Sequence, residues 1–454
     1  MKPIRNLSVC LLSGMAALAM LSSASAAAPG APGDKNVVVQ FMSAADIANA
    51  RLNGTQPAQL QSRQLSLMAS GPPPLVAAQD FPHGPGLPVW VYNVNNSGRD
   101  GMTHFGSMVG TNPFTGKHTT RLPVVIVPMI ITTHQVATSL DLKSFILTTA
   151  PGDVTQNSGA AQSTCLSAPN NVPSTLIQQS PLFQNAPFSF GGVFMGNTQY
   201  IDAYMRAQFY QVLNQDPDNY HVLFGPVRIA PPITIDVPAN EGLAIPAGSS
   251  VAALFGLCGT VQILDINWFD TLINDTLLPQ LEATAGVNDA TIPIFFMYNT
   301  DLSSPVNNLN TCCVLGYHSF AGEPRPTQTY SVAEIDTSML FPPAFENTTA
   351  LSHELGELVD DPFTNNEVAP WGHVGQQGGC QENLENGDPL SGTALPPITM
   401  SNGFAYNVQE LAFFSWFIGG QSIGVNGWFS DNGTFTTDAG PACGVDLDND
   451  GDGS

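Results

Sequence analysis

The chain has 454 residues, of which 43% are hydrophobic, and it carries 36 acidic side chains against only 12 basic ones. This length and apolar content suffice for a packed core in one large domain or a few smaller ones. The formal charge of −24 is far from the basic surface that binding to nucleic-acid phosphates requires. We therefore expect no nucleic-acid partner.

The first 26 residues have the features of a secretory signal peptide. Lys2 and Arg5 precede an apolar run from Leu7 to Leu21, and Ala24-Ser25-Ala26 forms a small-residue cleavage site. No later stretch reaches the ~18 apolar residues of a membrane-spanning helix. We expect a secreted or periplasmic protein without a membrane span.

Six cysteines follow this segment, and an even number in an exported chain favours disulfides. They are Cys165, Cys258, Cys312, Cys313, Cys380 and Cys443. Cys312 and Cys313 are neighbours, so we expect them to take different partners, while the pairing is otherwise open. For Cys380 a disulfide is favoured over a metal-bound thiolate.

The chain divides into three parts after the signal segment. Residues 27–88 are rich in Ala, Gln, Pro and Ser and predict a loosely ordered N-terminal arm, whose processing is left open. Residues 89–435 predict the main domain, and residues 436–454 an acidic tail. Short β-like runs, Val89–Tyr92 and Val124–Val127, open the domain.

Apolar spacing predicts the elements that follow. Helical spacing covers Thr198–Gln215 and Ile266–Ala283, and the β-like segment Val227–Val237 is interrupted by Pro231 and Pro232. Three further strands and a helix are expected at Ile292–Tyr298, Cys313–Phe320, Thr329–Ile335 and about Ala344–Val359, the helix ending before Pro362.

This last helix contains an H-E-x-x-E motif from His353 to Glu357. His353, Glu357 and Asp360 share one helix face, and the leucines of the segment face the opposite way. An imidazole and a second donor one turn apart, with Glu354 beside them to accept a proton from a bound water, suit a divalent metal. The alternative is an exposed helix with a solvated acidic face.

The motif resembles the H-E-x-x-H of zincin metallopeptidases, with Glu357 in the place of the second histidine. A carboxylate there would weaken the metal as a Lewis acid. Two flanking segments, Gly316-Tyr317-His318-Ser319 and the Cys380–Asp388 segment with its E-x-x-D element, make the sequence similar to the phosphate-induced/EXORDIUM-like family and its exported bacterial relatives. The resemblance covers roughly residues 291–388 and implies a zincin-like core.

On this basis His353 and Glu357 are expected to bind Zn²⁺ and Glu354 to act as general base. A third ligand is needed, because catalytic zinc sites normally use three protein donors and a water. Glu385 and Asp388 are candidates from the E-x-x-D element. The remaining assignments stay open: His373 rivals them as third ligand, and His318 is either an orienting or transition-state partner or a structural histidine.

The acidic tail resembles the first part of an EF-hand calcium loop. Its aspartates alternate around Gly451 but lack the closing glutamate, so Ca²⁺ binding there competes with a merely solvated acidic end. The aspartates are Asp446, Asp448, Asp450 and Asp452.

Together these features predict an α+β protein with a zincin-like core, in which a mixed sheet packs against the active-site helix and the periphery is rich in strands and loops. The expected function is that of an exported metal-dependent hydrolase, most simply a zinc metallopeptidase-like protein acting on peptides or proteins. Two alternatives remain: a secreted binding or cell-surface protein with a structural or degenerate metal site, and a carbohydrate-active enzyme with paired carboxylates.

Overall fold

The computed structural model describes residues 86–438, except for residues 96, 115–117, 163–164, 167, 169, 214–218, 323–327, 342–346 and 372–380. The expected signal peptide, nearly all of the N-terminal arm and the calcium-loop-like segment of the tail therefore lie outside the described residues. So do three individual candidates, His373, Cys380 and Cys443.

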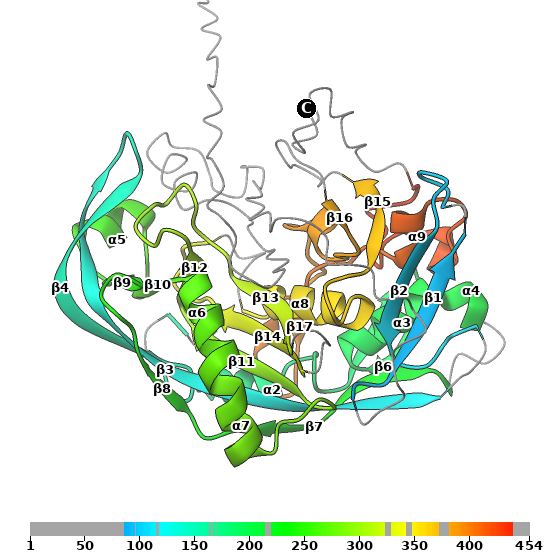
Figure 1. The fold of residues 1–454 in the computed structure, drawn as a ribbon, viewed down its shortest axis with the longest axis horizontal. Coiled ribbons are helices and arrows are strands. Elements are labelled where there is room, and N and C mark those ends of the chain that lie inside the picture. The colour runs from blue at the N-terminus through cyan, green and yellow to red at the C-terminus, as the bar shows by residue number, and fades with distance from the viewer. Residues whose placement is uncertain are drawn as a thin grey trace, which may run out of the picture.

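A ten-stranded mixed sheet forms the centre of the protein (Figure 1). Its strands are β3 (Thr119–Asp141), β4 (Ile146–Asn157), β7 (His221–Ile229), β8 (Ile233–Asp236), β9 (Gly242–Ile245), β10 (Val261–Asp265), β11 (Ile292–Tyr298), β12 (Thr300–Ser303), β13 (Gly316–Ala321) and β14 (Gln328–Ile335). The main order is β12-β10-β9-β3-β11-β14-β13, and β4, β7 and β8 also pair with β3. β3, β11 and β14 run parallel, whereas β13 lies antiparallel to β14 at the edge.

Side chains of the central strands alternate between two apolar cores. In β3, Val124 and Ile126 face the core that contains Leu355, while Val125 and Val127 face the core on the other side of the sheet. Both faces of these strands are covered, which explains why they are apolar throughout rather than alternating with polar residues. The predicted strands at Val124–Val127, Ile292–Tyr298 and Thr329–Ile335 are confirmed in β3, β11 and β14.

One face of the sheet is covered by a continuous helical rod, and Figure 1 shows it crossing the strands. The rod consists of α6 (Ile266–Leu272), a π-helical turn η3 (Ile273–Leu277) and α7 (Leu278–Ala285), which confirms the predicted helix. Asp265 caps its start by accepting hydrogen bonds from the backbone N–H groups of residues 267 and 268.

Helix α8 (Thr349–Asp360) covers the opposite face and packs on β13, β14, β2 and α3. The helix begins later than predicted, at Thr349, and ends before Pro362 as expected. All twelve of its residues are buried, so the alternative of an exposed helix with a solvated acidic face is wrong. The leucines Leu351, Leu355 and Leu358 enter the core, and the opposite side of the helix carries the polar site.

Smaller elements surround α8 and the sheet. The strand pairs are β1 (Val89–Val94) with β2 (His104–Val109), β5 (Ala186–Phe190) with β6 (Val193–Thr198), β15 (Glu367–Trp371) with β16 (Gln381–Asn383), and β17 (Ile398–Thr399) with β18 (Ala405–Tyr406). The helices are α2 (Pro173–Gln178), α3 (Tyr200–Gln208), α4 (Tyr210–Leu213), α5 (Ser250–Phe255), α9 (Phe414–Ile418) and the 3₁₀ turns η5 (Asp388–Leu390) and η6 (Val425–Gly427). The predicted helix at Thr198–Gln215 is thus split into α3 and α4.

Two disulfides are present among the described cysteines. One joins Cys165 to Cys258, and the other joins the sequence neighbours Cys312 and Cys313. The expectation that these neighbours take different partners is therefore wrong: their segment is fully buried, and their sulfur atoms bond to each other.

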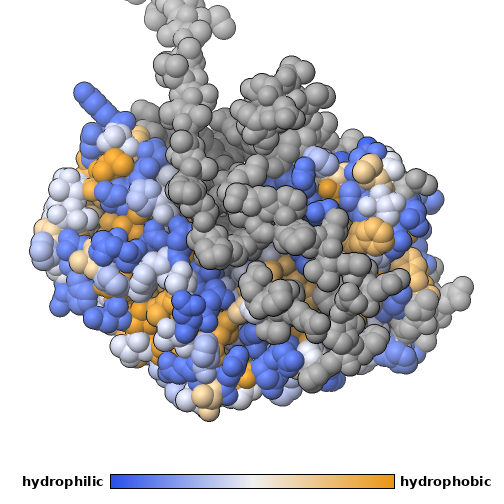
Figure 2. Space-filling model, in the orientation of Figure 1, coloured by the Kyte–Doolittle hydropathy of each residue, from blue (hydrophilic) through white to orange (hydrophobic). Residues whose placement is uncertain are grey.

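The described part of the chain has no helix with the length and apolar character needed to cross a membrane. In Figure 2, hydrophilic residues are interspersed with apolar ones over the described surface of this face.

Candidate metal centre

Two predicted site residues of helix α8 meet a third from the 3₁₀ turn η5. His353 and Glu357 lie one turn apart, with His353 Nε2 2.9 Å from Glu357 Oε1. The same Nε2 is 3.4 Å from Asp388 Oδ1. One ligand atom from each of the three residues lies within 4.8 Å of the others. We call this group the His353 lobe.

The tautomer of His353 is set by an amide. Its Nδ1 lies 3.1 Å from Gln409 Oε1, while Gln409 Nε2 donates to the carbonyl of Gly387 at 2.6 Å. Because the amide NH₂ is already directed at a carbonyl, the amide oxygen faces the ring, and Nδ1 is the nitrogen that carries the proton. Nε2 is therefore the nitrogen that faces the carboxylates, and once it is deprotonated its lone pair is placed as in a metal-bound histidine.

The E-x-x-D segment is held against α8 by its two middle residues. Asn386 Nδ2 donates to the carbonyl of Gly356 at 2.9 Å, and the Gly387 N–H donates to Glu357 Oε1 at 3.2 Å. A Cβ at Gly387 would lie 2.5 Å from His353 Cγ, so only glycine fits beneath the ring. This packing delivers Asp388 as the third donor of the His353 lobe.

His318 reaches the centre from the edge strand β13. Its Nε2 lies 3.1 Å from the carbonyl oxygen of Asp361 and donates to it. Nδ1 is left facing Glu354 Oε2 at 3.4 Å and Glu357 Oε2 at 3.6 Å. His318, Glu354 and Glu357 form a second compact group of ligand atoms, which we call the His318 lobe.

The Gly-aromatic-His segment is part of this strand and lies within the predicted strand Cys313–Phe320. Gly316 leaves room for the helix, since a Cβ there would lie 2.8 Å from the Val332 carbonyl oxygen and 3.1 Å from Glu354 Cγ. Tyr317 points into the core on the other side of the sheet, and the alternation of the strand then directs His318 toward α8.

The six predicted site residues are buried, each with at most 1% of its surface exposed. Glu385 is the one that joins neither lobe, although its carboxylate is close enough to be influenced by Glu357 and His318. Several polar atoms make no hydrogen bond to any described residue: His353 Nε2, His318 Nδ1 and both carboxylate oxygens of Glu354 and of Glu385. Nitrogen and oxygen atoms that converge in a buried site without hydrogen-bond partners fit the ligands of a bound cation.

Burial and neighbouring charges separate the pKa values of these groups. Burial raises the pKa of Glu354 to about 7, although His318 and His353 act in the opposite direction. Burial also favours neutral Glu357, but His353 and His318 outweigh it and hold its pKa at about 2. Burial raises the pKa of Asp388 to about 8.

The histidines respond to the same carboxylates. For His318 and His353 burial alone would lower the pKa, yet the carboxylates raise it well above the usual value. Without a metal, protons thus compensate the charge of the site.

Asp360 has a structural role, although it shares the predicted metal-binding face. It accepts hydrogen bonds from Tyr204 Oη at 2.8 Å, Gln208 Nε2 at 2.8 Å and Asn386 Nδ2 at 2.9 Å. It belongs to neither lobe.

Gln409 and Gly387 were missed by sequence reasoning. Gln409 lies 56 residues from His353 in an apolar stretch with no motif. Gly387 could have been noticed in the sequence, because it lies inside the E-x-x-D element.

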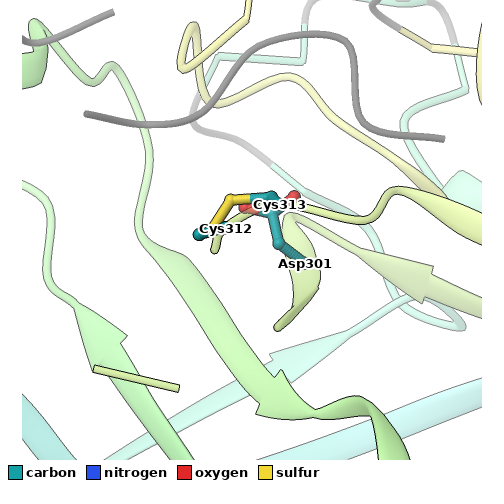
Figure 3. A group of neighbouring side chains, drawn as sticks. All are labelled: Asp301, Cys312 and Cys313. Carbon is teal, nitrogen blue, oxygen red and sulfur yellow. A yellow bond between two sulfur atoms is a disulfide. The ribbon is translucent and has the colours of Figure 1, made fainter. Parts of the chain in front are cut away.

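A third group of ligand-type side chains lies near the start of β13. Figure 3 shows Asp301 beside the Cys312–Cys313 disulfide. Because both sulfurs are used in the disulfide, this group offers no thiolate to a metal in the oxidised form.

The fold and these two lobes together define a mixed α+β protein with a buried histidine-carboxylate centre that could hold a metal ion. Comparisons with protein-family models, with curated proteins and with solved structures give no match to the chain.

Proposed function

We propose that the protein is an exported metal-dependent hydrolase, most simply a zinc metallopeptidase-like enzyme related to the phosphate-induced/EXORDIUM-like family. The observation that carries the proposal is the His353 lobe, in which an imidazole lone pair and two carboxylates converge. Three protein donors and a water are the usual ligands of a catalytic zinc.

The arrangement of secondary structure supports a zincin-like core. Helix α8 carries the H-E-x-x-E motif and lies across β14 and the antiparallel edge strand β13. The signal-like N-terminus and the Cys165–Cys258 disulfide support export.

A bound divalent cation would supply Lewis acidity toward a water molecule and a substrate carbonyl. Glu354 is the residue that accepts a proton from the attacking water, because its two carboxylate oxygens make no hydrogen bond to any described residue and are available for it. His318 Nδ1 lies beside that carboxylate, 3.4 Å from Glu354 Oε2. Glu354 then returns the proton to the leaving amine, which completes hydrolysis of a peptide bond.

A secreted binding or cell-surface protein with a structural metal is the second candidate. Burial favours it, because the donors of the His353 lobe have at most 1% exposure, whereas an enzyme must admit substrate. The carboxylate at position 357 also reduces the Lewis acidity expected of a zinc bound there.

Metal analysis combined with a Glu354→Gln variant tests the proposal. The purified protein should contain metal and hydrolyse unfolded protein or peptide mixtures, and chelation should abolish this activity. Glu354→Gln should keep at least one ion per chain and lose activity at least 10²-fold. Glu282→Gln, exposed on α7, is the matched control and should be unchanged.

The two candidates give different results. Full activity in the Glu354→Gln protein would contradict the assigned base. Bound metal with no hydrolysis in the wild-type protein would favour the structural-metal candidate.

A further inference from the structure

Glu357 lies between two imidazoles and presents a different oxygen to each. Oε1 is 2.9 Å from His353 Nε2, and Oε2 is 3.6 Å from His318 Nδ1. A carboxylate used in this way is the usual bridge between two metal ions, whereas a ligand of one ion needs only one of these contacts.

Both histidines are prepared for a metal in the same manner. In His353 the Nδ1 proton goes to Gln409 Oε1, and in His318 the Nε2 proton goes to the carbonyl oxygen of Asp361. Each ring therefore turns its other nitrogen toward carboxylate oxygens. A cation, either a proton on the ring or a metal ion, is needed between that nitrogen and the carboxylates, and this holds in each lobe.

The charge of the site supports a second ion. Three carboxylates belong to the two lobes, Glu354, Glu357 and Asp388. A fourth, Glu385, joins neither lobe but is close enough to be influenced by Glu357, and the four carry a formal charge of −4 when ionised. Within the described residues, the ion pairs of Glu354 and Glu357 are made to histidines and not to lysine or arginine. One divalent ion would leave a charge of −2 in a buried site, which is costly, whereas two ions neutralise it.

We propose that the centre binds two divalent cations, one in each lobe, with Glu357 as the bridge. This inference rests on the proposed metal-dependent function and deepens it. Two histidines and three carboxylates supply ligand atoms to the two lobes. Dinuclear carboxylate centres in helical bundles use the same residue types, with two histidines and four carboxylates. In two-metal hydrolytic sites the ions lie about 3.5–4 Å apart, a spacing that one carboxylate can bridge.

The ligand atoms of the two lobes also indicate which metals bind and how the two oxygens of Glu354 divide their roles. Only oxygen and nitrogen donors are present in the two lobes, so Mn²⁺ or Zn²⁺ is expected rather than a thiophilic ion. Glu354 faces His318 through Oε2, so it can bind the second ion with that oxygen and keep Oε1 for the proton.

Titration of the metal-free full-length protein with Mn²⁺ and with Zn²⁺ tests the proposal. We expect two ions per chain by elemental analysis after removal of excess metal. Two Mn²⁺ ions in adjacent lobes should give the electron paramagnetic resonance spectrum of a coupled pair. An ion bound by the aspartates of the C-terminal segment would give the signal of a single, uncoupled Mn²⁺. The spectrum therefore distinguishes binding by these aspartates from binding in the two lobes.

Three variants locate the ions. His318→Ala should lower the stoichiometry from two to one and remove the coupled spectrum. Glu357→Gln should also abolish the coupling, because the bridge is lost. His134→Ala is the matched control, since His134 also pairs with two carboxylates, Asp153 and Asp236, but on the surface, and it should keep both ions.

The outcomes for the second ion and for the proposed function are distinguishable. One ion per wild-type chain, unchanged in His318→Ala, would overturn the dinuclear centre and leave a mononuclear hydrolase intact. No bound ion at all would overturn both. If His318→Ala does not fold, the wild-type spectrum alone decides, because two uncoupled ions or a single ion would contradict the proposal.

Discussion

His353 depends on a glutamine that belongs to no motif. Gln409 accepts from Nδ1 and is itself held by two hydrogen bonds. Its side-chain Nε2 donates to the Gly387 carbonyl, and its backbone N–H donates to the side-chain Oγ of Ser352 at 2.9 Å. It therefore determines which ring nitrogen faces the carboxylates.

Replacing Gln409 by leucine should weaken metal binding by 10- to 100-fold, because the ring loses the acceptor that sets its tautomer. Competition with a chromophoric chelator measures this change. Gln184→Leu alters an exposed glutamine whose amide donates to the Gln178 carbonyl, and it should leave the affinity unchanged. Equal affinities for the two variants would show that Gln409 does not orient His353.

Asp360 makes the stability of the protein depend on pH. Burial raises its pKa from 3.8 to about 6, although its hydrogen bonds from Asn386, Gln208 and Tyr204 oppose the shift. The proton is therefore bound more tightly in the folded state than in the unfolded chain. The resulting stabilisation is complete below about pH 4 and is lost as the pH rises through about 6.

Asp360→Asn removes this titration. Between pH 4 and 7 the free energy of unfolding of the wild-type protein should fall by about 3 kcal/mol relative to the variant. Urea denaturation at several pH values measures the difference between the two free energies of unfolding. Any destabilisation that the asparagine causes equally at every pH does not change how this difference varies with pH. If this difference did not change between pH 4 and 7, the raised pKa of Asp360 would be contradicted.

Helix α8 connects the main core to the candidate metal centre. Its leucines pack into the main core while His353, Glu354 and Glu357 face the polar site. The position of the ligands along the helix is thus maintained by apolar packing on the other side.

Leu355→Ala should lower the free energy of unfolding by about 2–5 kcal/mol, because Leu355 is fully buried and its removal leaves a cavity. Leu142→Ala makes the same chemical change at a side chain with 46% exposure and should cost no more than about 0.5 kcal/mol. Urea denaturation of both variants checks the prediction. A similar loss in both would argue that α8 is not packed as described.

Sequence patterns were sufficient for the elements with strong periodicity and for the local motif. The buried strands β11 and β14 and the rod from α6 to α7 follow directly from apolar spacing, and the H-E-x-x-E helix places His353 and Glu357 together because they are one turn apart.

Contacts over long distances in the sequence were not predictable. Asp388 was one of three candidates for the third donor, and only the hydrogen bonds of Asn386 and Gly387 to α8 select it for the His353 lobe. The 23-residue strand β3 pairs with several strands at once, which no local pattern specifies. The Cys312–Cys313 disulfide was also missed, because sequence separation alone argued against it.

The Cys165–Cys258 disulfide connects segments 93 residues apart. Closing a loop of this length restricts the unfolded chain and stabilises the folded state by about 4–5 kcal/mol in the chain-entropy model. The Cys312–Cys313 disulfide joins adjacent residues and closes no comparable loop.

Removing each disulfide by paired alanine substitution should therefore have different effects on the unfolded state. Cys165→Ala with Cys258→Ala should lower the free energy of unfolding by about 2–5 kcal/mol and increase the denaturant m-value, since the unfolded chain expands. Cys312→Ala with Cys313→Ala is the control and should leave the m-value unchanged. An increased m-value in both proteins would contradict the loop argument.

The glutamate at position 357 has a consequence for how such proteins are searched for. An imidazole at this position would offer a single nitrogen to one neighbour, whereas the glutamate reaches both His353 and His318. Substituting histidine would restore the common peptidase signature and at the same time disconnect the two halves of the cluster. A search restricted to that signature would discard this chain because of the residue that lies between both histidines of the candidate site.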